Sequence, residues 1–213
     1  MIEKKLPPSS RREQNKAERR AAIVEIASRC FREIGYGGTT MSAIAQEMGG
    51  SKGTLWSYFS TKEELLAAVI DSATAAFHSF LATALDPEKD IRAVLTSFCE
   101  TMFERISRPE AIGLQRLVIS QAERFPEIGR LFYERAPAFN QAALTQFFSR
   151  HMEKGNIRPD DPSDASRMLL DMCTAGYHDR VLYGLEPQNK AIEQREAARV
   201  VKQFLRCYAS EKV

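Results

Sequence analysis

Apolar residues recur every three or four positions along almost the whole chain, and no convincing strand pattern interrupts them. Proline and glycine divide this pattern into segments of helical length. We therefore expect an all-α protein of about nine helices. They are expected at about residues 16–34, within 39–50, within 50–65, and at about 61–85, 90–107, 110–122, 126–154, 163–183 and 187–209.

The charge is distributed unevenly along the sequence. Residues 1–62 contain eleven Lys or Arg and six Glu, a net charge of +5, whereas the remaining residues contain 19 basic and 22 acidic side chains, a net charge of −3. A basic module on an acidic body favours a polyanionic partner for the module. We expect a disordered basic tail over residues 1–15, a small domain over 16–62 and a larger helical domain over 63–213.

Three residues in the basic module have the spacing of a helix-turn-helix. Counted from Met41, Ala45 is fifth, Gly49 is ninth and Leu55 is fifteenth. Two helices that cross near a right angle need a small residue at the fifth place, and the turn needs a residue that tolerates positive φ. Thr40 fits the N-cap of the first helix. Thr61, with Glu64 three residues later, forms a capping-box pattern that predicts the start of the next long helix.

The helix after the turn has an unusual outward face. On a helical wheel, Leu55 and Phe59 share the inward side. The outward side carries small polar and flat aromatic residues, namely Gly53, Thr54, Trp56, Ser57 and Tyr58. Glycine inside a helix costs about 1 kcal/mol relative to alanine, but it allows a nucleic-acid backbone to approach while hydroxyls and ring edges reach phosphates or bases. Packing on the first helix is an equal alternative for Trp56, whereas phosphate contact is favoured for Tyr58.

Lys62 lies in the first turn of the next helix, where a cation meets the positive end of the helix dipole at a cost of about 0.3–1 kcal/mol. Free backbone amides and a lysine at that position form an anion site suited to a DNA phosphate. A freely solvated lysine is the alternative. The residues expected to contact DNA are Thr40, Ser51, Lys52, Gly53, Thr54, Trp56, Ser57, Tyr58 and Lys62.

The stretch TTMSAIAQEMGGSKGTLWSYFSTKEELL follows a helix that ends in REIGYGG. Over about residues 20–67 the sequence resembles the DNA-binding domain of the TetR family of bacterial transcriptional repressors. It departs from the family at Gly50, where an apolar residue is usual, and at Ser57, where an aromatic residue is common, so the turn and the base contacts could differ. Residues 114–137, LQRLVISQAERFPEIGRLFYERAP, are similar to the regulatory domain of AefR-like members.

This resemblance implies a homodimer that binds a palindromic operator in double-stranded DNA and is released by a small-molecule effector. It also implies that the last two long helices form a four-helix interface between subunits. The last helix has an apolar stripe wide enough for its own core and a partner. We expect the dimer interface to contain Val200, Val201, Phe204, Leu205 and Tyr208; a terminal helix that is merely buried is the alternative.

An effector cavity among the helices of the larger domain is a further implication of the resemblance. Soft methionines and aromatic rims suit an apolar or aromatic ligand, although most such residues belong to a core. The expected pocket residues are Phe77, Phe80, Phe98, Met102, Leu117, Gln121, Tyr133, Met172 and Tyr177. Further candidates for polar contacts are His78, Gln115, Arg116 and Asp171.

Other classes of function find little support in the sequence. It has no Gly-rich phosphate loop, no HExxH and no nucleophile elbow, so we do not expect an enzyme, a metal or a cofactor. The four cysteines lack CxxC spacing and are expected to be buried thiols. No stretch approaches about 18 uncharged apolar residues and no signal-peptide core is present, which favours a cytoplasmic protein without membrane contact. A DNA-binding regulator without a ligand, or an all-α binding protein or enzyme, is the alternative function.

Overall fold

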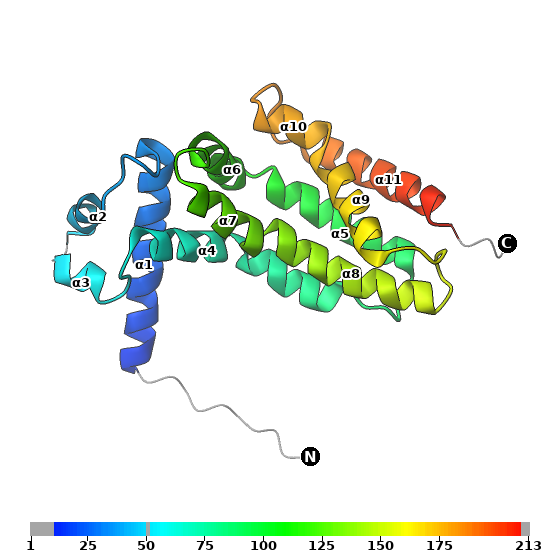
Figure 1. The fold of residues 1–213 in the computed structure, drawn as a ribbon, viewed down its shortest axis with the longest axis horizontal. Helices are drawn as coiled ribbons and strands as arrows, with labels where there is room; N and C mark the ends of the chain where they lie inside the picture. The colour runs from blue at the N-terminus through cyan, green and yellow to red at the C-terminus, as the bar shows by residue number, and fades with distance from the viewer. Residues whose placement is uncertain (1–10, 50–51, 210–213) are drawn as a thin grey trace, which may run out of the picture. The chain divides into compact units, whose positions relative to one another are not determined.

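The computed structural model describes residues 11–49 and 52–209. Across these residues the backbone forms eleven α-helices and no strand (Figure 1), which confirms the all-α class but not the expected number of nine helices. The chain divides into two compact units, an N-terminal unit up to Val69 and a C-terminal unit from Ile70. The sequence placed this division earlier, at residue 62. The helix that crosses it, α4 (Lys62–Ala84), contributes residues to both units.

The N-terminal unit consists of α1 (Arg11–Ile34), α2 (Met41–Glu47), α3 (Lys52–Trp56) and the beginning of α4. Residues 11–15, which the sequence analysis assigned to the tail, belong to α1. Arg, Glu and Gln are good helix formers and Glu13 lies in the first turn, where an acidic side chain is favourable. The third helix is shorter than expected, because residues 57–59 continue it only as hydrogen-bonded turns.

The helix-turn-helix geometry is confirmed at the three positions that predicted it. Ala45 is 2% exposed and Leu55 is fully buried, so both belong to the core of this unit. Gly49 has φ +62°, the left-handed conformation that the turn requires. α2 packs against both α1 and α3, and Phe59 joins the core with Phe31 of α1.

Two threonines cap the N-termini of helices α2 and α4, as their sequence patterns predicted. The Thr40 hydroxyl accepts a hydrogen bond from the Ala43 amide at 3.1 Å, which makes Thr40 the N-cap of α2. The Thr61 hydroxyl accepts from the Glu64 amide at 3.0 Å, directly before α4 begins. The Glu64 carboxylate accepts from the amide of Ser60, one residue before the cap, at 2.8 Å. Both helices therefore have an N-terminal amide satisfied locally.

The C-terminal unit contains the rest of α4 and seven further helices. They are α5 (Ile91–Ile106), α6 (Pro109–Gln121), α7 (Pro126–Arg135), α8 (Pro137–Glu153), α9 (Pro162–Thr174), α10 (Tyr177–Leu182) and α11 (Lys190–Cys207). The longer helices α5, α8, α9 and α11 lie side by side (Figure 1): α8 packs on α9, and α11 packs on α5 and α9. This packing forms the core of the unit.

The two additional helices arise from breaks that the sequence analysis did not predict. A single helix was expected over residues 126–154, but it ends at Arg135 and restarts at Pro137. Proline has no amide hydrogen and its ring obstructs the preceding turn, so it is favoured at the first helical position. The helix expected over 163–183 ends at Thr174, because Gly176 has φ +77° and begins a new helix at Tyr177.

The expected dimer residues on α11 lie mostly inside their own subunit. Val200 and Phe204 are fully buried, Val201 is 2% exposed and Tyr208 is 4% exposed. The Phe204 ring stacks on both Phe148 and Tyr208, with ring centroids 5.0 and 4.8 Å apart. These four side chains pack within their own subunit, and their expected place in the dimer interface stays a prediction. Leu205 is half-buried.

One further expectation needs correction. Cys30, Cys99 and Cys173 are buried free thiols as expected, but Cys207 is exposed at the end of α11. By length and composition alone, α4 passes the test for a membrane-spanning helix, as the core helices of soluble proteins also can. Its residues Leu65, Leu66 and Ile70 are completely buried against protein, as in a core helix of a soluble domain.

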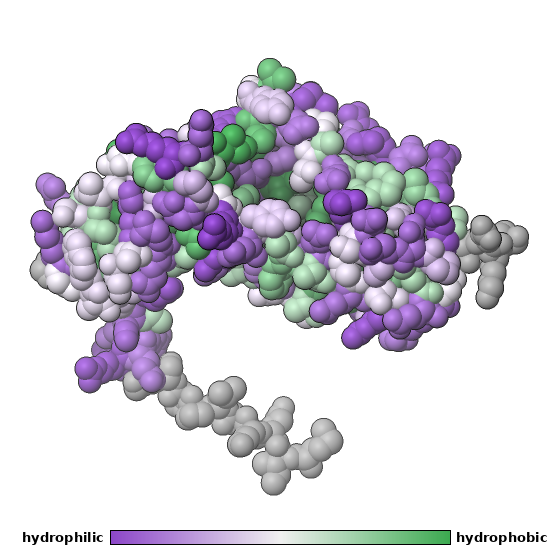
Figure 2. Space-filling view, in the orientation of Figure 1, coloured by the Kyte–Doolittle hydropathy of each residue, from purple (hydrophilic) through white to green (hydrophobic). Residues whose placement is uncertain are grey.

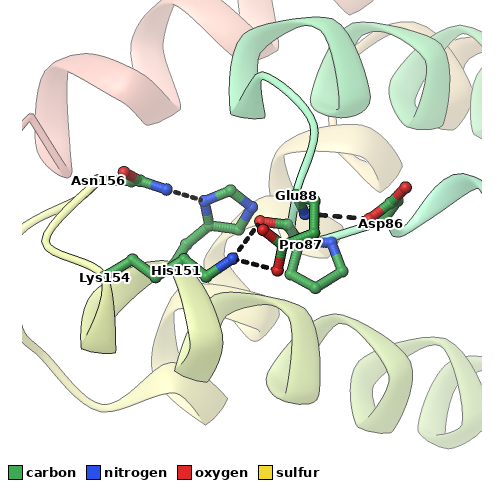
Figure 3. Close-up of polar contacts among 6 residues, drawn as sticks. All are labelled: Asp86, Pro87, Glu88, His151, Lys154 and Asn156. Carbon is green, nitrogen blue, oxygen red and sulfur yellow. Dashed lines mark hydrogen bonds and ion pairs between the residues drawn. The ribbon is translucent and has the colours of Figure 1, made fainter.

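The end of α8 is tied to the connection between α4 and α5 (Figure 3). Lys154 Nζ donates a hydrogen bond to the Pro87 carbonyl at 3.0 Å and pairs with the Glu88 carboxylate. His151 is fully buried beside them, and its Nδ1 accepts from Asn156 Nδ2 at 2.9 Å. Burial and, secondarily, the positive charge of Lys154 lower the pKa of His151 below its usual value. His151 is therefore neutral in the folded protein near pH 7.

Candidate nucleic-acid interface and cavity

The outward face of α3 and the turn after it are accessible, as the sequence predicted. Lys52, Gly53 and Ser57 are exposed, and Thr54 and Tyr58 are half-buried. Trp56 is 42% exposed. The alternative that Trp56 packs as core is therefore wrong, and a large flat ring is presented to solvent. Ser51, the remaining candidate on this helix, lies outside the described residues.

A hollow between α2 and α3 extends this face. It is lined by Thr40, Ser42, Ala43, Ala45, Gln46 and Lys52. The Lys52 side chain is exposed, and within the described residues it makes no ion pair and no side-chain hydrogen bond. The Thr40 hydroxyl caps α2 as an acceptor, so its own hydrogen remains available for donation. The Ser57 hydroxyl donates to the Thr54 carbonyl at 2.7 Å and retains acceptor capacity.

Lys62 has a different environment from the one expected. Its ammonium group donates hydrogen bonds to the carbonyl oxygens of Tyr36 and Thr39, at 2.8 and 3.2 Å, and lies 4.1 Å from the centroid of the Tyr36 ring. Lys62 is half-buried. These carbonyls offset the unfavourable position of a cation at a helix N-terminus, and a phosphate contact of Lys62 stays a prediction. In this structure Lys62 fastens α4 to the loop between α1 and α2.

The neighbouring residue makes a second link to the same loop. The Tyr36 hydroxyl donates to a Glu63 carboxylate oxygen at 2.8 Å. A backbone hydrogen bond at the helix start and, next, this bond from Tyr36 lower the pKa of Glu63. Tyr36 itself is 1% exposed, and its hydroxyl and its backbone carbonyl oxygen both make hydrogen bonds to α4. The loop that precedes α2 is thereby fixed to α4, and with it the start of the helix-turn-helix.

The C-terminal unit has two adjacent, partly open pockets that share six lining residues, and we call them the two lobes of one cavity. The smaller lobe has a volume of about 90 Å³ and the larger one about 130 Å³. Figure 2 shows hydrophobic residues gathered around a hollow on this unit, near α6 and α10. Both lobes share a wall formed by α5 to α8, whose residues are Met102, Ile106, Gln115, Phe132, Ala136 and Asn140. The unpredicted break between α7 and α8 therefore forms part of the wall.

The structure brings only some of the expected pocket residues to this cavity. Phe77 and Met102 line it, and so does Gln115 from the polar candidates. Phe98 and Tyr177 are core residues with 0 and 1% exposure, because they face the packed helices. Tyr133 is 57% exposed on the surface of α7. The remaining pocket candidates, Phe80, Leu117, Gln121 and Met172, line neither lobe.

Among the polar residues of the cavity that the sequence analysis did not single out are Arg105, Asn140 and His178. Arg105 lines the smaller lobe, His178 lines the larger one and Asn140 lines both. Arg105 lies in the last turn of α5, Asn140 near the start of α8 and His178 near the start of α10. Asn140 and His178 follow the two breaks at Pro137 and Gly176. The proline and the glycine at these breaks are the sequence features that could have indicated where Asn140 and His178 lie.

Each of these three residues has a buried polar atom without a hydrogen-bond partner in the described part of the chain: Arg105 Nε, Asn140 Oδ1 and His178 Nδ1. Buried polar atoms are normally paired, and an unpaired one costs about 1–3 kcal/mol. Three of these atoms belong to residues of one apolar cavity, where a bound ligand would supply the missing partners. Burial also lowers the pKa of His178, so its imidazole is neutral.

The fold and these two sites define a class of protein: a helical regulator with an exposed helix-turn-helix in one unit and a cavity in the other. The comparisons give the family. Residues 23–69 match the description "Bacterial regulatory proteins, tetR family", and residues 93–210 match "AefR-like transcriptional repressor, C-terminal domain". The chain belongs to the TetR family of transcriptional repressors.

Relatives and solved structures agree with this assignment. The HTH-type transcriptional repressor Rv1474c of Mycobacterium tuberculosis is 29% identical over 184 residues, covering 84% of this chain and 90% of that protein. A TetR-family transcriptional regulator from Mesorhizobium loti superimposes with a TM-score of 0.79 at 27% identity, over 90% of this chain and 97% of that one. The flavonoid-responsive regulator FrrA has a TM-score of 0.76 at 25% identity, over 92% and 100%.

Proposed function

We propose that this protein is a cytoplasmic, ligand-responsive repressor that binds a palindromic operator as a homodimer and releases it when a small apolar or aromatic effector occupies the cavity. The observation that carries the proposal is the cavity of the C-terminal unit, with three unpaired buried polar atoms around an apolar wall. The flavonoid response of the regulator FrrA supports an aromatic effector.

The DNA contacts are proposed on the accessible face of α2 and α3. Lys52 supplies a phosphate contact, and Thr40 lies beside it in the same hollow. Gly53, Thr54, Trp56, Ser57 and Tyr58 present the surface for base edges and sugars. Two copies of this surface read two half-sites, so the operator is expected to be an inverted repeat with half-sites about one or more helical turns apart.

The link between cavity and DNA is proposed to run through α4. This one helix carries Lys62, which fastens the helix-turn-helix unit, and Phe77, which lines the cavity. A ligand that fits one arrangement of α4 better than another shifts the population of DNA-binding forms by its difference in affinity. The protein does no chemistry in this account; it converts binding in the cavity into release of the operator.

A regulator without a small-molecule ligand is the second candidate, because both lobes are smaller than the usual ligand pocket of about 300–1,000 Å³. The experiment that tests the proposal begins with selection of bound sequences from a random DNA pool. Footprinting of the selected DNA should then reveal a symmetric site occupied by a dimer. A single asymmetric half-site bound by a monomer would overturn the dimeric mode of binding.

A further inference from the structure

The size and shape of the cavity limit its ligand. An apolar cavity of about 150 Å³ accepts a single benzene molecule. The two lobes have volumes of about 90 and 130 Å³ and share most of one wall. One aromatic ring with short substituents therefore fits the two adjacent lobes, whereas a molecule of several fused rings requires the helices to separate. Phe132 and Met102, which line both lobes, supply the ring and thioether contacts that such a ligand favours.

The charge in the cavity favours an acidic group on this ligand. Arg105 is the one ionised side chain among the residues that line the two lobes, and no Asp or Glu lines either of them. Its Nε–H is buried and has no acceptor in the described chain. Arginine remains charged in proteins and its guanidinium pairs best with a carboxylate or phosphate. A carboxylate in the smaller lobe provides the missing acceptor and the counter-charge together.

The other two unpaired atoms, Asn140 Oδ1 and His178 Nδ1, require a hydrogen-bond donor on the ligand. Gln115 Nε2 donates to the Ile106 carbonyl, so the Gln115 oxygen faces His178 Nε2, 3.0 Å away. His178 therefore carries its proton on Nε2, and its unpaired Nδ1 is an acceptor. The unpaired Asn140 Oδ1 is also an acceptor. With exposures of 7 and 3%, Asn140 and His178 receive little hydrogen bonding from solvent.

On this basis, and resting on the proposed function, we propose that the cavity binds a monocyclic aromatic acid that carries a hydroxyl group. The carboxylate accepts a hydrogen bond from Arg105 Nε–H. The hydroxyl donates to Asn140 Oδ1, whose residue lines both lobes. The ring packs against Phe132 and Met102. A simple fatty acid satisfies Arg105 but leaves both acceptors unpaired, and a simple phenol leaves the charge of Arg105 uncompensated.

The first test uses the full chain without DNA and a series of probes. The melting temperature and the dissociation constant are measured with 3-hydroxybenzoate, 4-hydroxybenzoate, benzoate, phenol and octanoate. We expect the better hydroxybenzoate to raise the melting temperature and to bind at least about tenfold more tightly than benzoate, phenol or octanoate. Equal affinity for benzoate, phenol or octanoate, or no binding of either hydroxybenzoate at millimolar concentration, would overturn the proposal.

The second test assigns the contacts. Asn140→Leu keeps the side-chain size and removes the acceptor, so the preference for hydroxybenzoate over benzoate should fall by about fivefold or more. Arg105→Gln should remove the preference for benzoate over phenol. Ser149→Ala, on the same helix as Asn140 but outside both lobes, is the matched control and should retain both preferences. Unchanged preferences in both cavity variants would contradict the assigned contacts. If a variant does not fold, the probe series on the natural chain decides whether the proposed ligand class is right.

Operator binding is measured separately so that two failures can be distinguished. If a neutral compound releases the operator and no hydroxybenzoate binds, the ligand class is wrong while the proposed function stands. If hydroxybenzoate binds with the expected preferences but no DNA sequence is selected, the ligand class stands and the proposed function fails.

Discussion

The ammonium group of Lys62 donates a hydrogen bond to the carbonyl oxygen of Tyr36, 2.8 Å away. This contact joins the first turn of α4 to the loop before α2. A cation predicted from sequence to bind a phosphate also holds the DNA-binding unit together, and its phosphate contact stays a prediction. Lys52, whose side chain is exposed beside the hollow between α2 and α3, is the second lysine expected to contact a phosphate.

These two lysines allow a matched comparison. Lys62→Met removes hydrogen bonds from a charged donor and the contact with the Tyr36 ring, so it should lower the free energy of unfolding of the N-terminal unit by about 1–3 kcal/mol. Lys52→Met should leave the stability unchanged and reduce the slope of log affinity against log salt by about 0.9 per subunit. Thermal unfolding and operator titrations at several salt concentrations measure both. A reduced salt slope for Lys62→Met with unchanged stability would support its phosphate role instead.

Ser57 provides a prediction about sequence preference. Its hydroxyl lies on the accessible surface of α3 and the turn after it, and is oriented by its hydrogen bond to the Thr54 carbonyl. Ser57→Ala should change the preferred base at one position of each half-site, with a cost of about 1–3 kcal/mol for the original base if the contact is direct. Selection from a random pool with both proteins detects this change. A uniform loss of affinity for all sequences would assign Ser57 to the DNA backbone instead.

The short-range features of the fold could be predicted from the sequence, whereas those that depend on distant partners could not. The caps at Thr40 and Thr61 and the turn at Gly49 are determined within a few residues of each position. The role of Lys62 depends on carbonyls 23 and 26 residues earlier in the chain. No local pattern encodes such a pairing.

The apolar stripe of α11 illustrates a second limit. Its period correctly predicts an amphipathic helix, but the period is the same whether a face packs on its own subunit or on another. Two polar residues of the expected cavity, Asn140 and His178, were missed for a related reason. They follow helix breaks at Pro137 and Gly176, and a continuous helical pattern was expected across each break.

Phe204 tests whether the apolar face of α11 stabilises its own subunit or a dimer interface. Because its ring is fully buried between Phe148 and Tyr208, Phe204→Ala should lower the free energy of unfolding by about 3–5 kcal/mol. The exposed neighbour Gln203→Ala is the control and should change it by less than about 0.5 kcal/mol. Denaturant unfolding measures both. A Phe204→Ala protein of normal stability that is only monomeric would place this residue in a subunit interface.

His151 predicts a dependence of stability on pH. Its folded-state pKa lies below the unfolded value of about 6.5, so the folded form resists protonation and the unfolded form does not. Stability from this residue is present above about pH 6.5 and is lost as the pH falls through the unfolded value toward the folded one. The other charged groups near its ring are Lys154, Asp90 and Glu88.

The variant His151→Gln isolates this contribution. It should lose less stability than the natural protein between pH 7.5 and pH 5.5, because glutamine does not titrate. Chemical unfolding at both values gives the difference. Equal losses in the two proteins would mean that the proton on His151 does not contribute to folding.

The central claim is that occupation of the cavity and binding of DNA oppose each other. Linkage requires that a ligand which weakens operator binding is itself bound more weakly in the presence of operator, by the same factor. The decisive measurement is the dissociation constant of the tighter-binding hydroxybenzoate for the full chain, with and without a saturating selected operator. We predict an affinity about ten to a hundredfold lower when the operator is bound, which corresponds to about 1.4–2.8 kcal/mol of coupling. Equal dissociation constants in the two titrations would contradict the account.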